Sequence, residues 1–138
     1  MIKGRGSDFS PFYAEREVEM KFELMMNGQP YEFIFGMGFL KTINAKATTK
    51  VPNSNYSINT GLKFIMAQVI DRDVEALAEV LMTANAGCTP RLKQKDLYEF
   101  LEAEDTDIEK VFDTVIDFFG KANATKTTYK ALTEDSEN

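Results

Sequence analysis

The chain of 138 residues contains no histidine and no tryptophan, and its only cysteine is Cys88. Without histidine, the sequence lacks the usual general base, the usual zinc ligand and any Ser-His or Cys-His catalytic pair. A single cysteine cannot form a disulfide within the chain, which suits a reducing compartment. These absences argue against most hydrolase designs and favour a cytoplasmic protein.

Long apolar runs are also missing from the sequence. The longest, around residues 37–40, is far below the ~20 residues that a membrane span requires. Residues 8–11 (DFSP) stand where a signal peptide needs a continuous apolar core. We therefore expect neither a membrane anchor nor secretion by that route.

A hydrophobic content of 43% is enough for one core of ordinary size. We expect a single α+β domain over residues 20–124, a leader over residues 1–19 and a polar tail over residues 125–138. The leader shows no periodicity, and we interpret it as a disordered arm or an extension of the first strand. The competing hypothesis makes Met20 the natural start, because the codons for residues 16–19 (REVE) can be rich in purines and form a ribosome-binding sequence.

Acidic residues outnumber basic ones, 22 against 16, and give a formal net charge of -6. Proteins that bind nucleic acid by neutralising its phosphates need clustered Lys and Arg, so we expect no nucleic-acid ligand. A nucleic-acid mimic would need carboxylates along one face, but here lysines lie between them. Solubility is the simpler explanation of the charge.

The strongest local pattern is a β-hairpin over residues 20–35, in which Asn27-Gly28 joins two alternating runs. Asn-Gly supplies the two positive φ values of a type I′ turn. Pairing outward from the turn predicts one wholly apolar face, with Leu24 opposite Tyr31, Phe22 opposite Phe33 and Met20 opposite Phe35. The other face is mixed and contains Lys21, Glu23, Met25, Glu32 and Ile34. A lone hairpin is marginal in water, so the apolar face must be covered by the rest of the chain.

Helices are predicted after the hairpin. Residues 36–38 (GMG) break the strand, and Phe39, Leu40 and Ile43 then recur at helical spacing before a polar loop over residues 48–55. Four more apolar stripes come after this loop, over residues 62–70 with Asn59 and Thr60 as cap candidates, 74–82, 97–101 and 108–119. Asp73 and Asp107 are N-cap candidates for two of them. The predicted fold is an N-terminal β-hairpin packed on a bundle of four to five helices.

No motif supports catalysis or a cofactor. The acidic residues between 102 and 109 lack the glycine and the spacing of a calcium loop, and we interpret them as a solvated turn. Residues 36–38 lack the third glycine and the Lys-Ser or Lys-Thr pair of a phosphate loop. Cys88 follows a predicted helix C-terminus, where the helix dipole opposes a thiolate. We therefore predict no catalytic residue, no metal and no cofactor.

The order of these features resembles the tail assembly chaperones of long-tailed phages and prophages of Gram-positive bacteria. The resemblance covers residues 20 to about 125. It is carried by residues 20–24 (MKFEL), 27–28 (NG), 31–33 (YEF), 36–40 (GMGFL), 61–62 (GL), 71–77 (DRDVEAL) and 122–125 (ANAT).

The resemblance implies a protein of the host cytoplasm that binds and solubilises the tape measure protein during tail assembly and is absent from the finished particle. It also implies contact with the tail tube protein, indirectly or through a longer frameshifted product. Two other classes stay open. One is a small acidic phage-encoded adaptor or inhibitor of a host protein, and the other is a histidine-free enzyme that uses carboxylates.

Apolar residues outside the predicted core are the candidates for partner binding. They are Met25 and Ile34 on the outward face of the hairpin, and Phe39 and Leu40 after the GMG turn. Coverage by a neighbouring helix or by a second subunit would equally explain them. Because an exposed apolar patch tends to self-associate, we also expect homo-oligomers in isolation.

Overall fold

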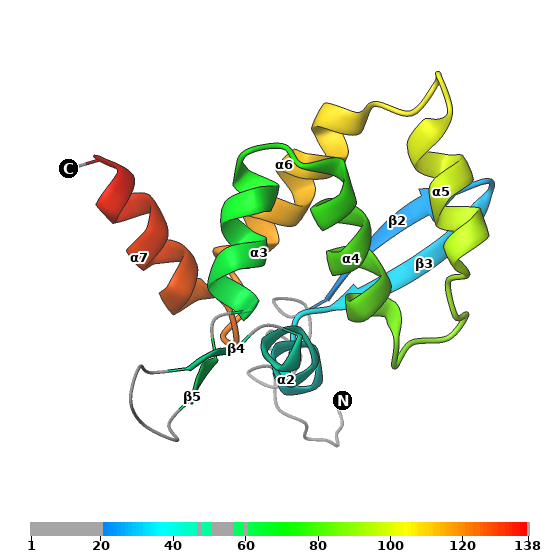
Figure 1. The fold of residues 1–138 in the computed structure, drawn as a ribbon. Helices are drawn as coiled ribbons and strands as arrows, with labels where there is room; N and C mark the ends of the chain where they lie inside the picture. Colours follow the sequence, from blue (N-terminus) through cyan, green and yellow to red (C-terminus); the bar gives the residue numbers. More distant parts are fainter. Residues whose placement is uncertain (1–20, 47, 51–56, 60, 138) are drawn as a thin grey trace, which may run out of the picture.

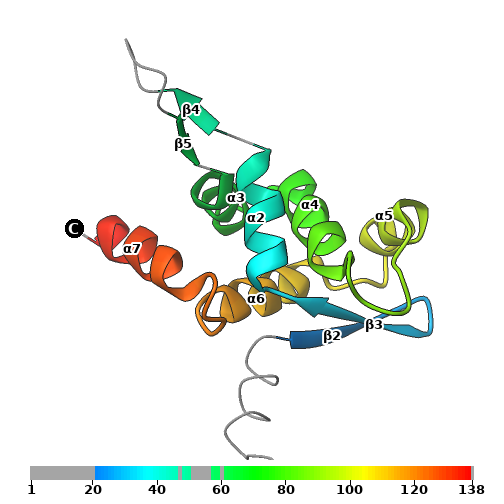
Figure 2. The same cartoon turned by 90° about the horizontal axis from the view of Figure 1, so that it is seen from below.

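The computed structural model describes residues 21–46, 48–50, 57–59 and 61–137. The described chain forms a β-hairpin, helix α2, a second small hairpin and helices α3 to α7 in sequence order. In Figure 1 the first hairpin runs behind α4 and α5, and α7 lies at the opposite end of the molecule from α5, as Figure 2 also shows. The predicted α+β fold, a hairpin followed by helices, is confirmed.

The first hairpin pairs β2 (Lys21–Met26) with β3 (Gln29–Ile34) in the predicted register, with Phe22 opposite Phe33. At the turn, φ is 55° at Asn27 and 79° at Gly28, as the Asn-Gly pair predicts. The predicted apolar face is turned inward: Phe22, Tyr31, Phe33 and Phe35 are buried, and Leu24 is half-buried. Met20, its predicted sixth member, lies outside the described residues.

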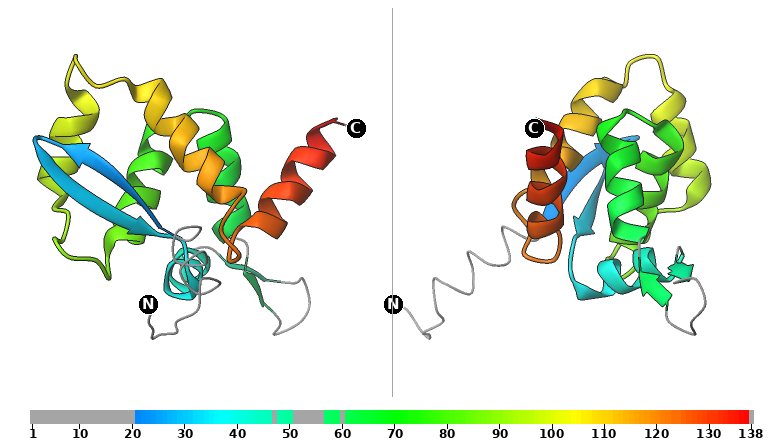
Figure 3. Two further views of the ribbon diagram at one scale, coloured as in Figure 1. Left: turned by 180° about the vertical axis from the view of Figure 1, so that it is seen from behind. Right: turned by 60° about the vertical axis from the view of Figure 1, so that its left-hand side comes forward.

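Aromatic rings attach this face of the hairpin to the helices. The Phe22 ring stacks on Phe33, with centroids 5.2 Å apart, and on Phe118 of α6 at 4.7 Å. Phe35 stacks on Phe119 at 5.1 Å. Viewed from behind, α6 lies beside the hairpin (Figure 3). The two-stranded sheet is therefore held by helix contacts on its apolar face, which a lone hairpin lacks.

Helices α2 (Met37–Ala45) and α3 (Gly61–Ile70) meet where the end of α2 touches the start of α3. A Cβ on Gly61 would lie 2.9 Å from the Cα of Asn44, so only glycine allows this approach. The Leu62 N–H donates to the side-chain oxygen of Asn44 at 2.9 Å. Asn44 thus caps α3, whereas the sequence suggested Asn59 or Thr60. Asn59 instead ends a strand, and Thr60 lies outside the described residues.

A second hairpin was not predicted. Strand β4 (Thr48–Lys50) pairs with β5 (Ser57–Asn59), and Thr49 lies opposite Ile58. The sequence predicted only a polar loop over residues 48–55. The β-branched residues of the two strands favour extended backbone, but three residues are too few to show an alternating pattern.

The next three helices agree with the predicted stripes. They are α4 (Val74–Asn85), α5 (Gln94–Glu102) and α6 (Ile108–Phe119). Asp73 and Asp107 are the N-caps of α4 and α6, because their carboxylates accept hydrogen bonds from the backbone N–H of Ala76 and Lys110 at 3.0 and 3.1 Å. The cap predictions are confirmed.

Residues expected to form a polar tail are instead helix α7 (Lys126–Glu137). Thr125, which is buried, precedes it and donates from its hydroxyl to the carbonyl of Phe119 at 2.7 Å. Tyr129 and Leu132 pack against the core cluster. Helix α7 was not predicted because two apolar residues at i, i+3 are a weak helical signal among so many polar residues. The described chain therefore contains one helix more than the predicted maximum, six against four to five.

Asn85, at the end of α4, is one of two buried polar residues in the described part of the chain. Its amide nitrogen donates to the carbonyls of Glu32, at 3.0 Å, and Pro90, at 3.2 Å. Its oxygen accepts a 2.6 Å hydrogen bond from the Leu92 N–H. One side chain therefore joins α4, strand β3 and the connection to α5.

Candidate partner-binding surfaces

Exposed large apolar side chains mark the candidate contact surfaces. Within the described residues they are Met25 (59% exposed), Met37 (65%), Phe64 (60%), Val74 (47%) and Tyr98 (45%). Met25 and Met37 lie apart, on β2 and α2. Phe64, Val74 and Tyr98 come from the consecutive helices α3, α4 and α5, which lie side by side on the front of the molecule in Figure 1. This face has the strongest claim to a partner.

A groove of about 560 Å³ separates α4 from α5, and we call it the α4–α5 groove. Apolar side chains from both helices line it: Val74, Ala78, Met82, Tyr98 and Leu101. Three carboxylates and one amide complete the lining: Glu75, Glu79, Glu102 and Gln94. The Gln94 side chain donates to the Tyr98 hydroxyl at 2.6 Å and so braces the ring on the groove wall.

Helical spacing explains why α4 contributes one wall. Val74, Ala78 and Met82 recur every fourth residue, so they lie along one side of the helix. Leu77 and Leu81, one position earlier in each turn, are fully buried in the core. Helix α4 therefore has two apolar faces, one packed inside and one left beside the groove.

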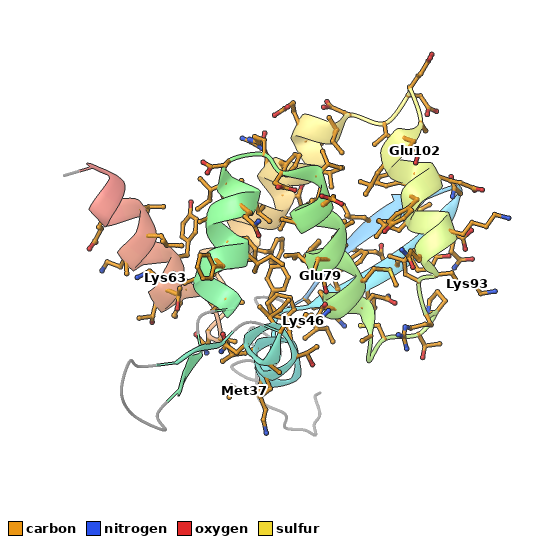
Figure 4. The ribbon with its side chains drawn as sticks, viewed as in Figure 1. Met37, Lys46, Lys63, Glu79, Lys93 and Glu102 are labelled. Carbon is orange, nitrogen blue, oxygen red and sulfur yellow. The ribbon has the colours of Figure 1, made fainter. Side chains whose placement is uncertain are left out.

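A second hollow, of about 290 Å³, lies on the other side of α4, where Phe64 and Ile65 of α3 and Lys46 contribute. Glu75 and Glu79 line both hollows and form an acidic ridge along α4. The Lys46 ammonium contacts the Glu79 carboxylate. Figure 4 shows Glu79 on α4 and Glu102 on α5, both toward the viewer.

The four residues predicted to bind a partner do not form one patch. Met25 is exposed and lines a third hollow with Leu24 and Phe100. Ile34 is half-buried at the far end of the hairpin, opposite Lys21, and Leu40 is half-buried on α2. Phe39 is only 5% exposed, and its ring packs on Phe35 with centroids 4.8 Å apart. Phe39 therefore presents little surface to a partner in this structure.

The sequence did not point to the α4–α5 groove. Val74 and Met82 were placed on the apolar stripe of their helix, but Val74 is about half exposed and Met82 is half-buried. The signal that could have found the groove is the double periodicity of α4, because positions 74, 78 and 82 extend its apolar arc beyond the single stripe that a core requires.

Metal ligands and a reactive thiol are two features that catalysis could use. The described residues contain no cluster of three or more His, Cys, Asp or Glu that could hold a metal ion. Burial raises the pKa of the Cys88 thiol; Glu32 raises that pKa further, and Lys21 partly offsets both effects. A higher thiol pKa means less of the reactive thiolate at neutral pH. None of the described helices is long and apolar enough to cross a membrane.

Comparison with known protein families identifies a match. A family model described as phage tail assembly chaperone protein, TAC, matches residues 23–134. The match begins within β2 and ends within α7, and it includes both helices of the α4–α5 groove. No curated protein and no solved structure matches the chain.

Proposed function

Because the chain belongs to the phage tail assembly chaperone family, we propose that it binds and solubilises the tape measure protein during tail assembly and leaves before the particle is complete. The observation that supports this proposal most directly is the face formed by α3, α4 and α5. Phe64, Val74 and Tyr98 are exposed there beside carboxylates, on a chain whose net charge is -6.

The proposed client explains this combination of apolar and acidic surface. A long helical protein with apolar stripes aggregates unless those stripes are covered. Exposed side chains such as Phe64 and Tyr98 can cover part of a stripe, and a net negative charge keeps the resulting complexes apart in solution. Binding of this kind requires no catalytic residue, metal or cofactor.

The proposal also includes the partners that act later in assembly. Tail tube subunits displace the chaperone as they polymerise around the tape measure protein, either directly or through a longer frameshifted product of the same gene. These events take place in the host cytoplasm. Without its client, the chaperone self-associates through the same apolar surface.

Co-expression with the tape measure protein encoded by the same phage tests the proposal. We expect the tape measure protein in the soluble fraction only when the chaperone is present, and both proteins in one peak after size-exclusion chromatography. An adaptor or inhibitor of a host protein would leave the tape measure protein insoluble, and that result would overturn the proposal.

Two variants test the hairpin's share in this binding. Met25→Glu combined with Ile34→Glu alters the outward face of the hairpin, where both side chains have access to water. We expect the double variant to fold and to solubilise less tape measure protein. The matched control places glutamate at Thr42 and Asn123, which are exposed, polar and outside the hairpin. Equal solubilisation by both double variants would remove the hairpin from the binding surface.

A further inference from the structure

We infer that the α4–α5 groove binds a helical segment of the client whose apolar stripe is flanked by lysine or arginine residues. The inference rests on the proposed function for the identity of the client. The shape and charge of the groove supply the chemistry of the segment.

The shape of the groove fits a helix. Val74, Ala78 and Met82 run along one wall over nine residues of α4. At a rise of 1.5 Å per residue, the distance from Val74 to Met82 is ~12 Å, which matches about two turns of a bound helix. The small Ala78 lies between the two larger side chains, and Tyr98 and Leu101 form the facing wall. A helix that projects apolar residues at i, i+3 or i+4, and i+7 would fill this lining.

The lining also has apolar surface left to bury. Val74 and Tyr98 are 47% and 45% exposed. Covering these side chains removes apolar area from water and favours binding. Helices α4 and α5 can stay in place when a partner covers these two side chains, because each helix is anchored in the core by a fully buried residue, Leu77 or Leu97.

The charges around the groove select the partner. Glu75 and Glu79 lie along the α4 wall, and Glu102 lies at the end of α5. Lys46 already contacts Glu79, whereas Glu75 and Glu102 have no ion pair within the described part of the chain. An acidic segment would be repelled here, and a lysine or arginine beside the apolar stripe would pair with a free carboxylate.

Synthetic peptides of ~20 residues, a length that spans about 30 Å as a helix, provide the test. One designed helix carries a leucine stripe flanked by lysines, and its control replaces every lysine with glutamate. A second set covers the tape measure protein of the same phage in overlapping segments. Binding is measured by fluorescence anisotropy at low and high salt. We expect the lysine peptide and the basic amphipathic segments to bind, more weakly at high salt, and the glutamate peptide to bind at least about tenfold more weakly.

Variants of the chain assign the binding to the groove. E75K with E102K reverses the two free carboxylates, and V74S with Y98S removes the exposed apolar side chains. All four positions are exposed, so we expect both variants to fold, as circular dichroism would show. Each should weaken binding of the lysine peptide by about tenfold or more. The matched control, D117K with E134K, makes the same change in net charge at exposed sites outside the groove and the hairpin and should bind as the wild type does.

Three results would overturn the inference. The first is that the groove variants bind the peptides as tightly as the wild type does. The second is that no tape measure segment binds although the whole protein is solubilised. The third is that V74S with Y98S abolishes self-association while the peptides fail to compete with it, which would assign the groove to a second copy of the chain. In each case solubilisation by the wild-type chain leaves the proposed function standing. Loss of that solubilisation in the co-expression assay would overturn the function itself.

Discussion

Replacing Asn85 with alanine tests how the hairpin is joined to the helices. The side chain is fully buried and makes three hydrogen bonds, to the carbonyls of Glu32 and Pro90 and from the N–H of Leu92. A hydrogen bond contributes about 1 kcal/mol net, and a buried donor left without a partner costs about 1–3 kcal/mol. The Leu92 N–H would be such a donor. We therefore expect N85A to lower the free energy of unfolding by about 3 kcal/mol.

Urea denaturation followed by circular dichroism measures this change. The midpoint should fall while the slope stays the same, because a similar surface is exposed on unfolding. In a thermal scan, a loss of about 3 kcal/mol corresponds to a decrease in Tm of about 10 °C for a chain of this size. Asn123→Ala is the matched control, since Asn123 is exposed, and it should change the free energy by less than about 0.5 kcal/mol. A loss in N85A as small as that of the control would refute the role assigned to the network.

The other predictions concern the α2–α3 contact and the thiol. In the same urea assay, G61A should lower the free energy of unfolding by at least about 3 kcal/mol, because the new Cβ would meet the backbone of Asn44. G38A, with nothing within 4 Å of its Cβ, should gain about 0.5 kcal/mol, and equal effects at the two glycines would contradict the close approach. Cys88 should react with iodoacetamide more slowly than in the urea-unfolded chain, with its rate rising at a higher pH, because burial and Glu32 raise the thiol pKa. Because the thiol pKa is higher in the folded chain than in the unfolded chain, the contribution of Cys88 to stability is complete below the unfolded-state pKa and is lost as pH rises through the folded-state pKa. Identical pH profiles of the reaction rate in the folded and unfolded chains would contradict the raised pKa.

Features set by neighbours in the sequence were predicted well. The Asn27-Gly28 turn fixes the hairpin register, and Asp73 and Asp107 cap the helices that begin directly after them. Features that join distant segments were missed. The cap of α3 comes from Asn44, 18 residues before the N–H that it accepts, and Asn85 reaches across 53 residues to the carbonyl of Glu32.

The candidate site follows the same division. Alternation along β2 predicted that Met25 faces outward, and it is exposed, although its contact with a partner stays a prediction. Phe39 was a candidate for partner binding because it follows the GMG turn outside the predicted core, but in the structure its ring packs on Phe35. The α4–α5 groove depends on where two helices lie relative to each other. The sequence of each helix has an ordinary amphipathic pattern, so the groove between them cannot be predicted from either pattern.

The contact between α2 and α3 also determines how freely the chain between them can vary. The end of α2 touches the start of α3 directly, through Gly61 and the Asn44 cap, so a contact outside the connecting segment helps to position the two helices. The entropy of closing a loop grows only with the logarithm of its length, and each doubling costs about 0.6 kcal/mol. Lengthening this segment therefore changes stability little, and related chains can diverge most in length here while keeping the same helix arrangement. The same property makes the segment a suitable place to insert an affinity tag or a fluorophore, since its strands β4 and β5 lie away from α5 (Figure 1).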